Sequence, residues 1–392
     1  MAFKKHGRQY DLVVFGATGY TGRLTAEHVA KALPSNLKWA VAGRSESKLQ
    51  GIVSDCKKIN SDRLPPSIEV ANIDDEAQLE ALVKKSFVVI TTVGPYCLHG
   101  ESIFKLCAEA GTHYLDCTGE VPWVARMIKK YENTAKKSGA IMVPQNGIES
   151  APPDVLTWAM AQHLRNDLNA STKDAVVTIH TLNSAPSGGT LATVLVHFEH
   201  FPLKEVIEST KPFAISPIPH TSGAKPQTSF LQSLLGVTSL PNLGLLTTSI
   251  AGKTDQAVVT RTWGLLHEIP SRKKEFYGPR FTWFRSLVKR FVYQPGEGVS
   301  REEMENEAVE YRGTAVPDLE SNPSQKQAFG RAWFHGGLYM LTGVFLAQGA
   351  LTILEDDLEL GGGLFTPACL GQKYLDRMNG AGFKVEVKTI EG

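Results

Sequence analysis

The feature that most constrains this chain is a glycine-rich segment at residues 16–22, GATGYTG, placed directly after the apolar run 12–15. Apolar residues at 26, 29, 30 and 33 follow with the spacing of a helix that has one apolar face. A buried strand, a glycine turn and a helix in this order suit a dinucleotide pyrophosphate, because backbone N–H groups and a positive helix end then approach the phosphates. The glycine spacing departs from the common G-x-G-x-x-G, so the prediction depends on this setting. The residues predicted to bind the nucleotide here are Gly16, Thr18, Gly19, Tyr20, Thr21 and Gly22.

The first part of the chain alternates short apolar runs with amphipathic stretches, which is typical of a parallel sheet covered by helices. Six strands are predicted, at residues 12–15, 39–42, 67–70, 87–93, 114–117 and 141–143. We therefore expect an α/β fold in which residues 1–150 form a Rossmann-type, doubly wound parallel sheet. Ligands of such sheets lie at the carboxyl ends of the strands, so the residues that directly follow the strands are candidates for a site.

After residue 150 the pattern changes to longer strands separated by stretches rich in Pro, Ser, Thr and Gly, which indicates a second, α+β domain over residues 151–392. Its predicted strands are 176–182, 256–265 and 308–316. We expect this domain to hold the substrate and to mediate any oligomer, such as a homodimer, and we allow for its C-terminal segment packing back onto the first domain. Ser300 and Glu303 form an S-x-x-E capping box, which predicts a short helix.

The composition argues against a nucleic-acid partner, because 41 basic residues are balanced by 40 acidic ones. The 5 cysteines contain no C-x-x-C pair, so we predict no disulfide framework and no metal site, and we expect a reducing compartment. Residues 1–10 carry no apolar stretch, so we expect no secretory signal and a cytoplasmic protein.

Two segments raise the question of a membrane. Residues 336–354 carry no charge over 19 positions, but their glycines and polar residues favour a buried core helix over a membrane span. Residues 281–293 combine aromatic, aliphatic and basic residues at helical spacing, which is typical of a packing or dimer helix and also of a helix on a lipid surface. Packing is the favoured interpretation, and peripheral association with a membrane or lipid droplet is the alternative.

The end of the second predicted strand distinguishes the two common dinucleotides. A carboxylate there would bind the free 2′-hydroxyl of NAD, whereas this chain has Arg44, Ser45 and Lys48. A guanidinium, a hydroxyl and an ammonium group suit a 2′-phosphate, so the predicted cofactor is NADP, in the form NADPH. Small residues and a proline of fixed φ close the fourth strand, where the nicotinamide is expected. These further cofactor residues are Val93, Gly94 and Pro95.

Polar residues that follow the fourth and fifth strands are candidates for the chemistry. Tyr96 and His99 are the predicted catalytic proton donors, since tyrosine and histidine are common general acids, whereas Cys97 is more typical of packing. Asp116 has a second interpretation, in which its carboxylate caps the next helix or ties down a loop. The segment 187–190, SGGT, either binds a substrate oxyanion or simply begins a helix. The predicted substrate-binding residues are Tyr114, Asp116, Glu120 and Asn146.

Taken together, the chain resembles the saccharopine dehydrogenase-like oxidoreductases, in the branch that includes trans-acting enoyl reductases. The matching segments are 14–22, 42–45, 93–96, the Y-x-D-x-T-G-E run at 114–120, 187–190, 295–298 and 366–368. The resemblance implies a Rossmann-type first domain, use of NADP, and a second domain whose mixed sheet shapes the substrate cleft. Where relatives tend to show aspartate, proline, glycine and tyrosine before the late apolar helix, this chain has His335-Gly336-Gly337-Leu338.

Three functions are compatible with this resemblance. The first is NADPH-dependent reduction of a C=C or C=O bond in a hydrophobic, acyl or polyketide-like metabolite, with hydride from the cofactor and a proton from the protein. The second is reduction of an imine formed between an amino acid and a keto acid, with Asp116 or Glu120 contacting the amine. The third is NADPH binding without turnover in a membrane-associated protein.

Overall fold

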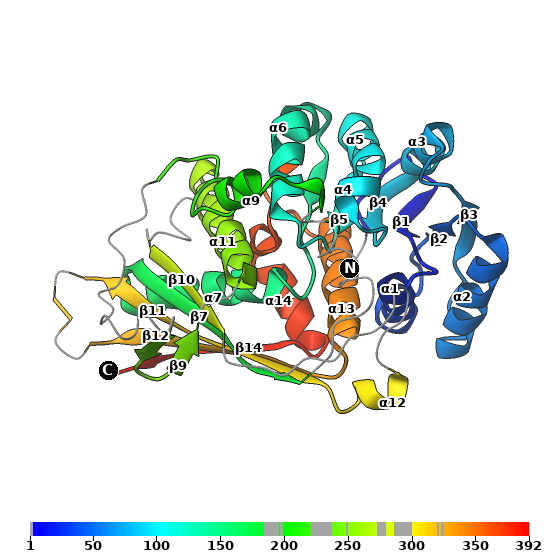
Figure 1. Cartoon of the computed structure of the whole chain (residues 1–392). Helices are drawn as coiled ribbons and strands as arrows, with labels where there is room; N and C mark the ends of the chain where they lie inside the picture. The colour runs from blue at the N-terminus through cyan, green and yellow to red at the C-terminus, as the bar shows by residue number, and fades with distance from the viewer. Residues whose placement is uncertain are drawn as a thin grey trace.

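Two seven-stranded sheets with helices between and around them make up the computed structural model (Figure 1). The structure describes residues 3–183, 196, 199–220, 237–247, 250–272, 280–285, 300–319, 321–322 and 325–391. The predicted segments 187–190 and 295–298 therefore lie outside the described residues.

The first sheet is entirely parallel, with the strand order β13-β6-β5-β4-β1-β2-β3. The order reverses between β1 and β4, which is the switch point where a doubly wound sheet binds its nucleotide. All six predicted strands are present, although β4 ends two residues before the predicted end. The bounds are β1 (Tyr10–Phe15), β2 (Trp39–Gly43), β3 (Ser67–Val70), β4 (Ser86–Thr91), β5 (His113–Asp116), β6 (Ile141–Val143) and β13 (Gly363–Leu364).

Helices cover both faces of this sheet, as its continuous apolar strands require. Leu12 and Val14 of β1 pack in one core with α1 (Tyr20–Ala32) and α2 (Glu46–Ile59). Val13 and Phe15 pack in a second core with α3 (Glu76–Lys85), α5 (Glu101–Ala110) and α6 (Val121–Ser138). The short α4 (Tyr96–His99) precedes α5 directly.

The predicted apolar core helix is α13 (Leu338–Glu355), and the structure confirms that it is a core helix. Within the described residues it is the helix long and apolar enough to cross a membrane, but 78% of its apolar window is buried inside the protein. It lies in the centre of the molecule (Figure 1), against α1, β4 and β5. It runs parallel to α1, since Tyr339 and Gln348 contact Tyr20 and His28 in the same order along both helices.

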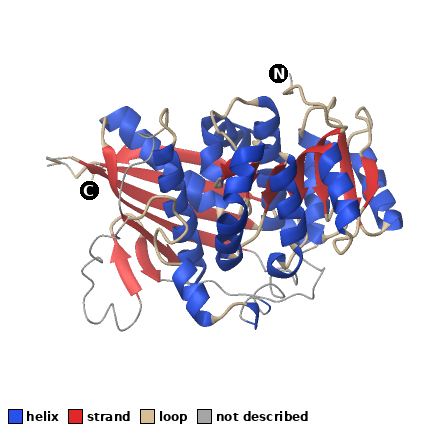
Figure 2. Cartoon of the chain, turned by 90° about the horizontal axis from the view of Figure 1, so that it is seen from above, coloured by secondary structure: helices blue, strands red, loops and turns tan. Residues whose placement is uncertain are grey.

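The second sheet is mixed, with the order β14-β12-β11-β7-β10-β9-β8 and one parallel pair, β7 with β10. Figure 2 shows its strands spread on the opposite side of the central helices from the first sheet. Its strands are β7 (Ser171–Asn183), β8 (Val237–Leu240), β9 (Gly244–Thr247), β10 (Arg280–Arg285), β11 (Ala308–Asp318), β12 (Gln327–His335) and β14 (Lys384–Ile390).

The helix α7 (Ala151–Leu168) covers one face of the second sheet. It comes close because Gly313 and Gly330 leave no room for a Cβ, which would lie 2.8 Å from Met160 side-chain atoms at each position. The remaining elements are α9 (Leu203–Ser209), α11 (Ile250–Glu268), α12 (Arg301–Met304), the 3₁₀ turn η1 (Pro367–Leu370) and α14 (Gly371–Gly380).

Two predictions for the second half were wrong. Residues 256–265, predicted as a strand, lie inside α11. Residues on several sides of this helix, such as Val258, Arg261 and Trp263, are buried, so its apolar pattern lacks the one-sided period that marks a surface helix. Residues 281–285 of the predicted helix 281–293 lie in strand β10, and the rest of that segment lies outside the described residues.

The capping box, in contrast, is confirmed. The Ser300 Oγ accepts the N–H of Glu303, and the Glu303 carboxylate accepts the N–H of Ser300.

Candidate functional site

The glycine turn after β1 is closed tightly by its own backbone. Gly16 has φ +86°, in the region that favours glycine, and its carbonyl accepts the N–H of Gly19 at 2.9 Å. A Cβ on Gly22 would meet the Gly16 carbonyl oxygen and lie 2.6 Å from Thr92 Oγ1. These contacts explain why glycines stand at the first and last positions of the segment.

The N-terminus of α1 opens from this turn at the carboxyl edge of the sheet. Gly19 is its N-cap residue, without a capping side chain, and the first turn holds no acidic residue. Thr18 and Gly19 are exposed, and Tyr20 and Thr21 are half-buried. The first N–H groups of a helix have no partners inside it, so this end is suited to an anion.

The residues predicted to distinguish NADP from NAD lie beside this turn, at the end of β2. Arg44 directly follows the strand, Ser45 is the N-cap residue of α2, and Lys48 lies in the first turn of that helix. Arg44 and Lys48 are exposed. A Cβ on Gly43 would lie 3.9 Å from Thr18 Oγ1, so the loops after β1 and β2 are neighbours.

The loop after β4 is joined to the glycine turn from the other side. The N–H of Thr92 donates to the Phe15 carbonyl at 3.0 Å, and its Oγ1 lies 3.2 Å from the Gly16 carbonyl oxygen. Val93 and Pro95 are half-buried and Gly94 is exposed. The structure therefore brings the three predicted cofactor segments together, after β1, β2 and β4.

Tyr96 is buried and its hydroxyl is held inside the protein. The hydroxyl donates to the Thr91 carbonyl at 3.0 Å and accepts the N–H of Cys117 at 3.4 Å. Burial raises the pKa of Tyr96 well above its ordinary value. His99, the last residue of α4, is half-buried. The proton-donor role of either residue stays a prediction.

Glu120, predicted to bind substrate, is buried and directed at α4. Its Oε1 accepts the N–H of Tyr96 at 2.8 Å, and its Oε2 accepts the N–H of Cys97 at 2.9 Å. These N–H groups belong to the first two residues of α4. Both carboxylate oxygens therefore accept hydrogen bonds from the start of α4.

Asp116 ties down two loops, which corresponds to the second interpretation of this residue. Its Oδ1 accepts the N–H groups of Thr118 and Gln145, each at 2.9 Å, and its Oδ2 accepts the hydroxyl of Tyr114 at 2.8 Å. Burial raises the pKa of Asp116 to about 7, although these hydrogen bonds oppose the shift. Asp116 and Tyr114 thus satisfy one another inside the fold.

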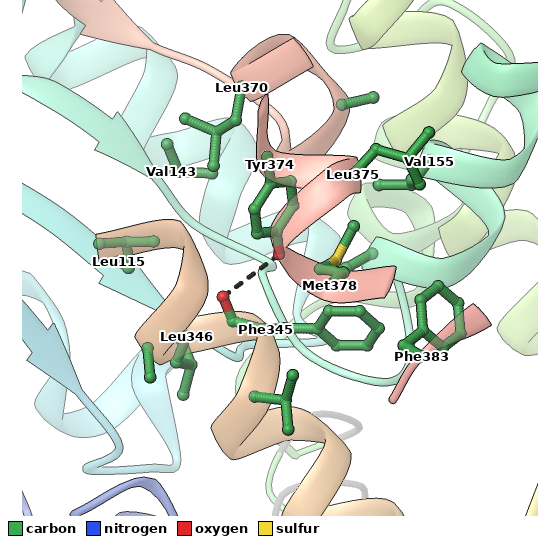
Figure 3. Packing of buried hydrophobic residues seen from close by; sticks show 14 of the residues in the cluster. Leu115, Val143, Val155, Phe345, Leu346, Leu370, Tyr374, Leu375, Met378 and Phe383 are labelled. Carbon is green, nitrogen blue, oxygen red and sulfur yellow. Dashed lines mark hydrogen bonds between the residues drawn. The ribbon is translucent and has the colours of Figure 1, made fainter. Parts of the chain in front are cut away.

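Asn146 connects the first sheet to two later helices. Its Nδ2 donates to the Phe345 carbonyl of α13 at 2.9 Å, and its Oδ1 accepts the hydroxyl of Tyr374 of α14 at 2.7 Å. The same hydroxyl lies 3.2 Å from the Phe345 carbonyl oxygen, the contact drawn in Figure 3. All four predicted substrate residues therefore form hydrogen bonds inside the protein.

The start of α13 borders the site, and the sequence analysis did not predict that this helix lies there. The ring of Tyr339, in the first turn of α13, lies 5.2 Å from the ring of Tyr20. The Thr342 hydroxyl accepts the N–H of Ile148, in the loop after β6. No local pattern near Tyr339 could have shown this, because the contact depends on how α13 packs on α1.

The comparisons with known proteins agree with this geometry. Residues 12–143 match the family model of the saccharopine dehydrogenase NADP binding domain. Over 97% of both chains, the sequence is 29% identical to a saccharopine dehydrogenase-like oxidoreductase of Rattus norvegicus. It is 26% identical to a trans-acting enoyl reductase of Mycobacterium bovis, over 96% of this chain and 97% of that one.

Two further similarities concern location and fold. The chain is 34% identical to a lipid droplet localized protein of Caenorhabditis elegans over 48% of this chain and 45% of that one. The apo saccharopine dehydrogenase (L-Glu forming) of Saccharomyces cerevisiae has a similar fold, with a TM-score of 0.51 and 12% identity, covering 97% of this chain and 99% of the other. The predicted resemblance, the fold class and the NADP cofactor are thereby confirmed.

Proposed function

We propose that this chain, an NADP-dependent oxidoreductase similar to the saccharopine dehydrogenase-like proteins, reduces a C=C or C=O bond in a hydrophobic, acyl or polyketide-like metabolite. NADPH would donate the hydride, and the second carbon or the oxygen of the double bond would take a proton from the protein or from water. The relative of Mycobacterium bovis named as a trans-acting enoyl reductase supports this choice of reaction.

The main support for the proposal is that the buried carboxylates of Asp116 and Glu120 are already hydrogen-bonded within the protein. Glu120 and Asp116 are the carboxylates predicted to contact an amine, and each accepts hydrogen bonds from the protein on both of its oxygens. A substrate with an amino group and two carboxylates would need charged groups aimed at it. Because both carboxylates are hydrogen-bonded to protein groups, they are not free to bind an amine, and an apolar substrate is favoured over an imine of an amino acid and a keto acid.

Apolar side chains on the elements that border the site support the same choice. Leu98, in α4, is 52% exposed, and Met340, in the first turn of α13, is 40% exposed. Both helices begin beside the cofactor loops, so these side chains suit the wall of an apolar substrate channel.

Of the two predicted proton donors, we propose His99. The Tyr96 hydroxyl donates to the Thr91 carbonyl and is buried, so it would have to break an internal hydrogen bond to reach a substrate. His99 is the last residue of α4 and is half-buried. Histidine is also the most common general acid in enzymes.

The test is an NADPH oxidation assay with matched substrates. We expect turnover with long-chain 2-enoyl or 3-oxoacyl thioesters, with a product that has gained two hydrogens by mass spectrometry. Turnover that requires an amine together with a keto acid would establish the imine reaction in its place. Retention of NADPH with every compound would favour the binding protein without turnover.

We also propose that the protein is cytoplasmic and works at a lipid surface, and the name of the Caenorhabditis elegans relative supports the second part. Leu203 and Ile207 lie one helical turn apart on α9 and are 67% and 49% exposed. We expect the protein to float with neutral-lipid droplets coated with phospholipid, and the Leu203→Glu, Ile207→Glu double variant to stay in the soluble fraction. Equal flotation of both proteins would contradict a role for this face.

A further inference from the structure

The loop between β4 and α4 has no capping side chain of its own. Pro95 is the N-cap residue of α4, and its side chain offers no hydrogen-bond acceptor to the N–H groups of that helix. Glu120, which precedes α6, supplies the acceptor from outside. Its two oxygens bind the N–H groups of Tyr96 and Cys97 at 2.8 and 2.9 Å.

A second tie holds the same loop through the side chain of Tyr96. Its hydroxyl donates to the Thr91 carbonyl and accepts the N–H of Cys117, so it links the last residue of β4 to the loop after β5. At the other end of the loop, Thr92 is bound to Phe15 and Gly16. The stretch 93–95 is therefore fixed at both ends, and some of these ties come from Cys117 and Glu120, which follow β5.

The Glu120 carboxylate is an unusual choice for a purely structural cap. It is 1% exposed, and within the described residues no cation forms an ion pair with it. A buried carboxylate without a cation is costly, and only charge-assisted hydrogen bonds offset that cost. Such bonds hold their donors more firmly than a neutral cap would, which suits a loop that must keep its shape against a ligand.

The strand order indicates which part of the cofactor meets this loop. In a doubly wound sheet of this order, the adenosine end would bind on the β2 side of the switch point, near Arg44, and the nicotinamide end would bind on the β4 side. We propose that Glu120 is a positioning residue for the nicotinamide ring: it does not touch the substrate, but it holds the turn 93–95 against the ring through Tyr96 and Cys97. This proposal depends on the NADP cofactor and not on the bond that the enzyme reduces.

The test separates the two ends of the cofactor by calorimetry. NADPH contains both ends, whereas 2′,5′-ADP contains only the adenosine end. For Glu120→Gln, in which an amide N–H₂ replaces one acceptor, we expect about tenfold weaker binding of NADPH and unchanged binding of 2′,5′-ADP. The fluorescence of bound NADPH should also show a more mobile ring, with lower anisotropy.

Glu101→Gln is the matched control. Glu101 lies at the start of α5, close in sequence to the same loop, but its carboxylate is 43% exposed and binds Lys130 and Tyr131. We expect this variant to bind both compounds like the wild type. If Glu120→Gln does not fold, Tyr96→Phe removes the second tie and should show the same selective loss of NADPH binding to a smaller degree.

Two results would overturn the proposal. In the first, a folded Glu120→Gln binds NADPH like the wild type or loses both compounds equally. In the second, the wild type binds 2′,5′-ADP as tightly as NADPH, so that the nicotinamide ring gains nothing from this turn. Neither result bears on the reduction of C=C or C=O bonds, which the turnover assay tests separately.

Discussion

Gly22 has the least room for a side chain among the residues of the nucleotide loop. A Cβ at this position would meet the Gly16 carbonyl oxygen and Thr92 Oγ1, so Gly22→Ala forces α1 away from the turn. We expect the variant to lose NADPH binding by at least about a hundredfold and to unfold at a lower urea concentration. Gly51→Ala, in α2 with nothing within 4 Å of its Cβ, is the control and should be neutral or slightly stabilising. Normal NADPH binding by Gly22→Ala would show that the turn is not the phosphate site.

Arg44 is predicted to distinguish NADPH from NADH. It is exposed at the end of β2, where it can form a charge-assisted hydrogen bond to the 2′-phosphate, and such bonds contribute roughly 1.5–3 kcal/mol. Arg44→Asp should weaken NADPH binding about tenfold or more and bring the affinity of NADH close to that of NADPH. Lys57→Asp, an exposed position near the end of α2, should leave the ratio unchanged. An unchanged ratio in Arg44→Asp would refute this role.

The positions of the loops in the site could be predicted from the sequence more readily than the hydrogen-bond partners of their side chains. Residues 16–22 follow β1 directly, as predicted, because glycine content and backbone conformation dictate where they lie, whereas the fourth strand ends at Thr91, two residues before its predicted end. The roles of polar side chains were harder to infer. Glu120 and Asp116 lie at the expected edge, yet their partners come from other loops, such as Cys97 and Gln145. Sequence spacing indicates where a carboxylate lies and not which N–H group it accepts.

At the scale of elements, a buried network joins α7, α11 and η1. Asp154, in the first turn of α7, accepts the N–H of Ala368 at 2.9 Å and the hydroxyl of Thr262 at 2.5 Å. The hydroxyls of Thr262 and Thr366 lie 2.5 Å apart. Three segments that are distant in sequence therefore meet at one carboxyl group, which is fully enclosed by the protein.

This network predicts a pH-dependent stability. Burial raises the pKa of Asp154 from 3.8 to about 7, so between these values the folded protein keeps a proton that the unfolded chain has lost. The contribution of Asp154 to the free energy of unfolding then falls as pH rises through this window, by at most about 1.4 kcal/mol per pH unit. In Asp154→Asn, which cannot ionise, urea unfolding measured at a series of pH values should show a shallower fall than in the wild type.

The exposed Asp376 of α14 provides the control for this measurement, and Asp376→Asn should keep the wild-type dependence on pH. A wild-type curve that is flat or rises between pH 4 and 7, with no difference from Asp154→Asn, would contradict the buried titration.

The packing of α11 against its neighbouring helices explains why residues 256–265 were predicted as a strand. The strands of the first sheet are apolar runs bounded by polar turns, and length and boundaries alone identify them. Residues 256–265 of α11 are also β-branched and apolar, but Arg261 and Thr262 within the run are buried because they bind Glu132 and Asp154. These polar partners belong to α6 and α7 and cannot be found from residues 256–265 alone. The local composition therefore favoured a strand over a helix.

For the whole molecule, the decisive feature is that the first sheet is completed by residues from the end of the chain. Leu115 of β5 and Val143 of β6 pack against α13 and α14 (Figure 3), and β13 pairs with β6 at the edge of the sheet. Asn146 hydrogen-bonds both helices. Residues 1–150 therefore contain the nucleotide loops but not the helix that covers β4 and β5 on the α1 face.

This arrangement predicts that the two halves unfold together. In a fragment of residues 1–150, the α13-facing side chains of β4 and β5, such as Ile90 and Leu115, would be exposed to water, at roughly 1.5–3 kcal/mol for each large side chain. A loss of several such contacts approaches the stability of a whole domain. We expect the fragment to bind ANS, to give no cooperative urea transition and to bind no NADPH, whereas circular dichroism and tryptophan fluorescence of the full chain should report one coincident transition. A fragment that unfolds cooperatively near the midpoint of the full chain would show that α13 is dispensable and that the nucleotide domain is an independent unit.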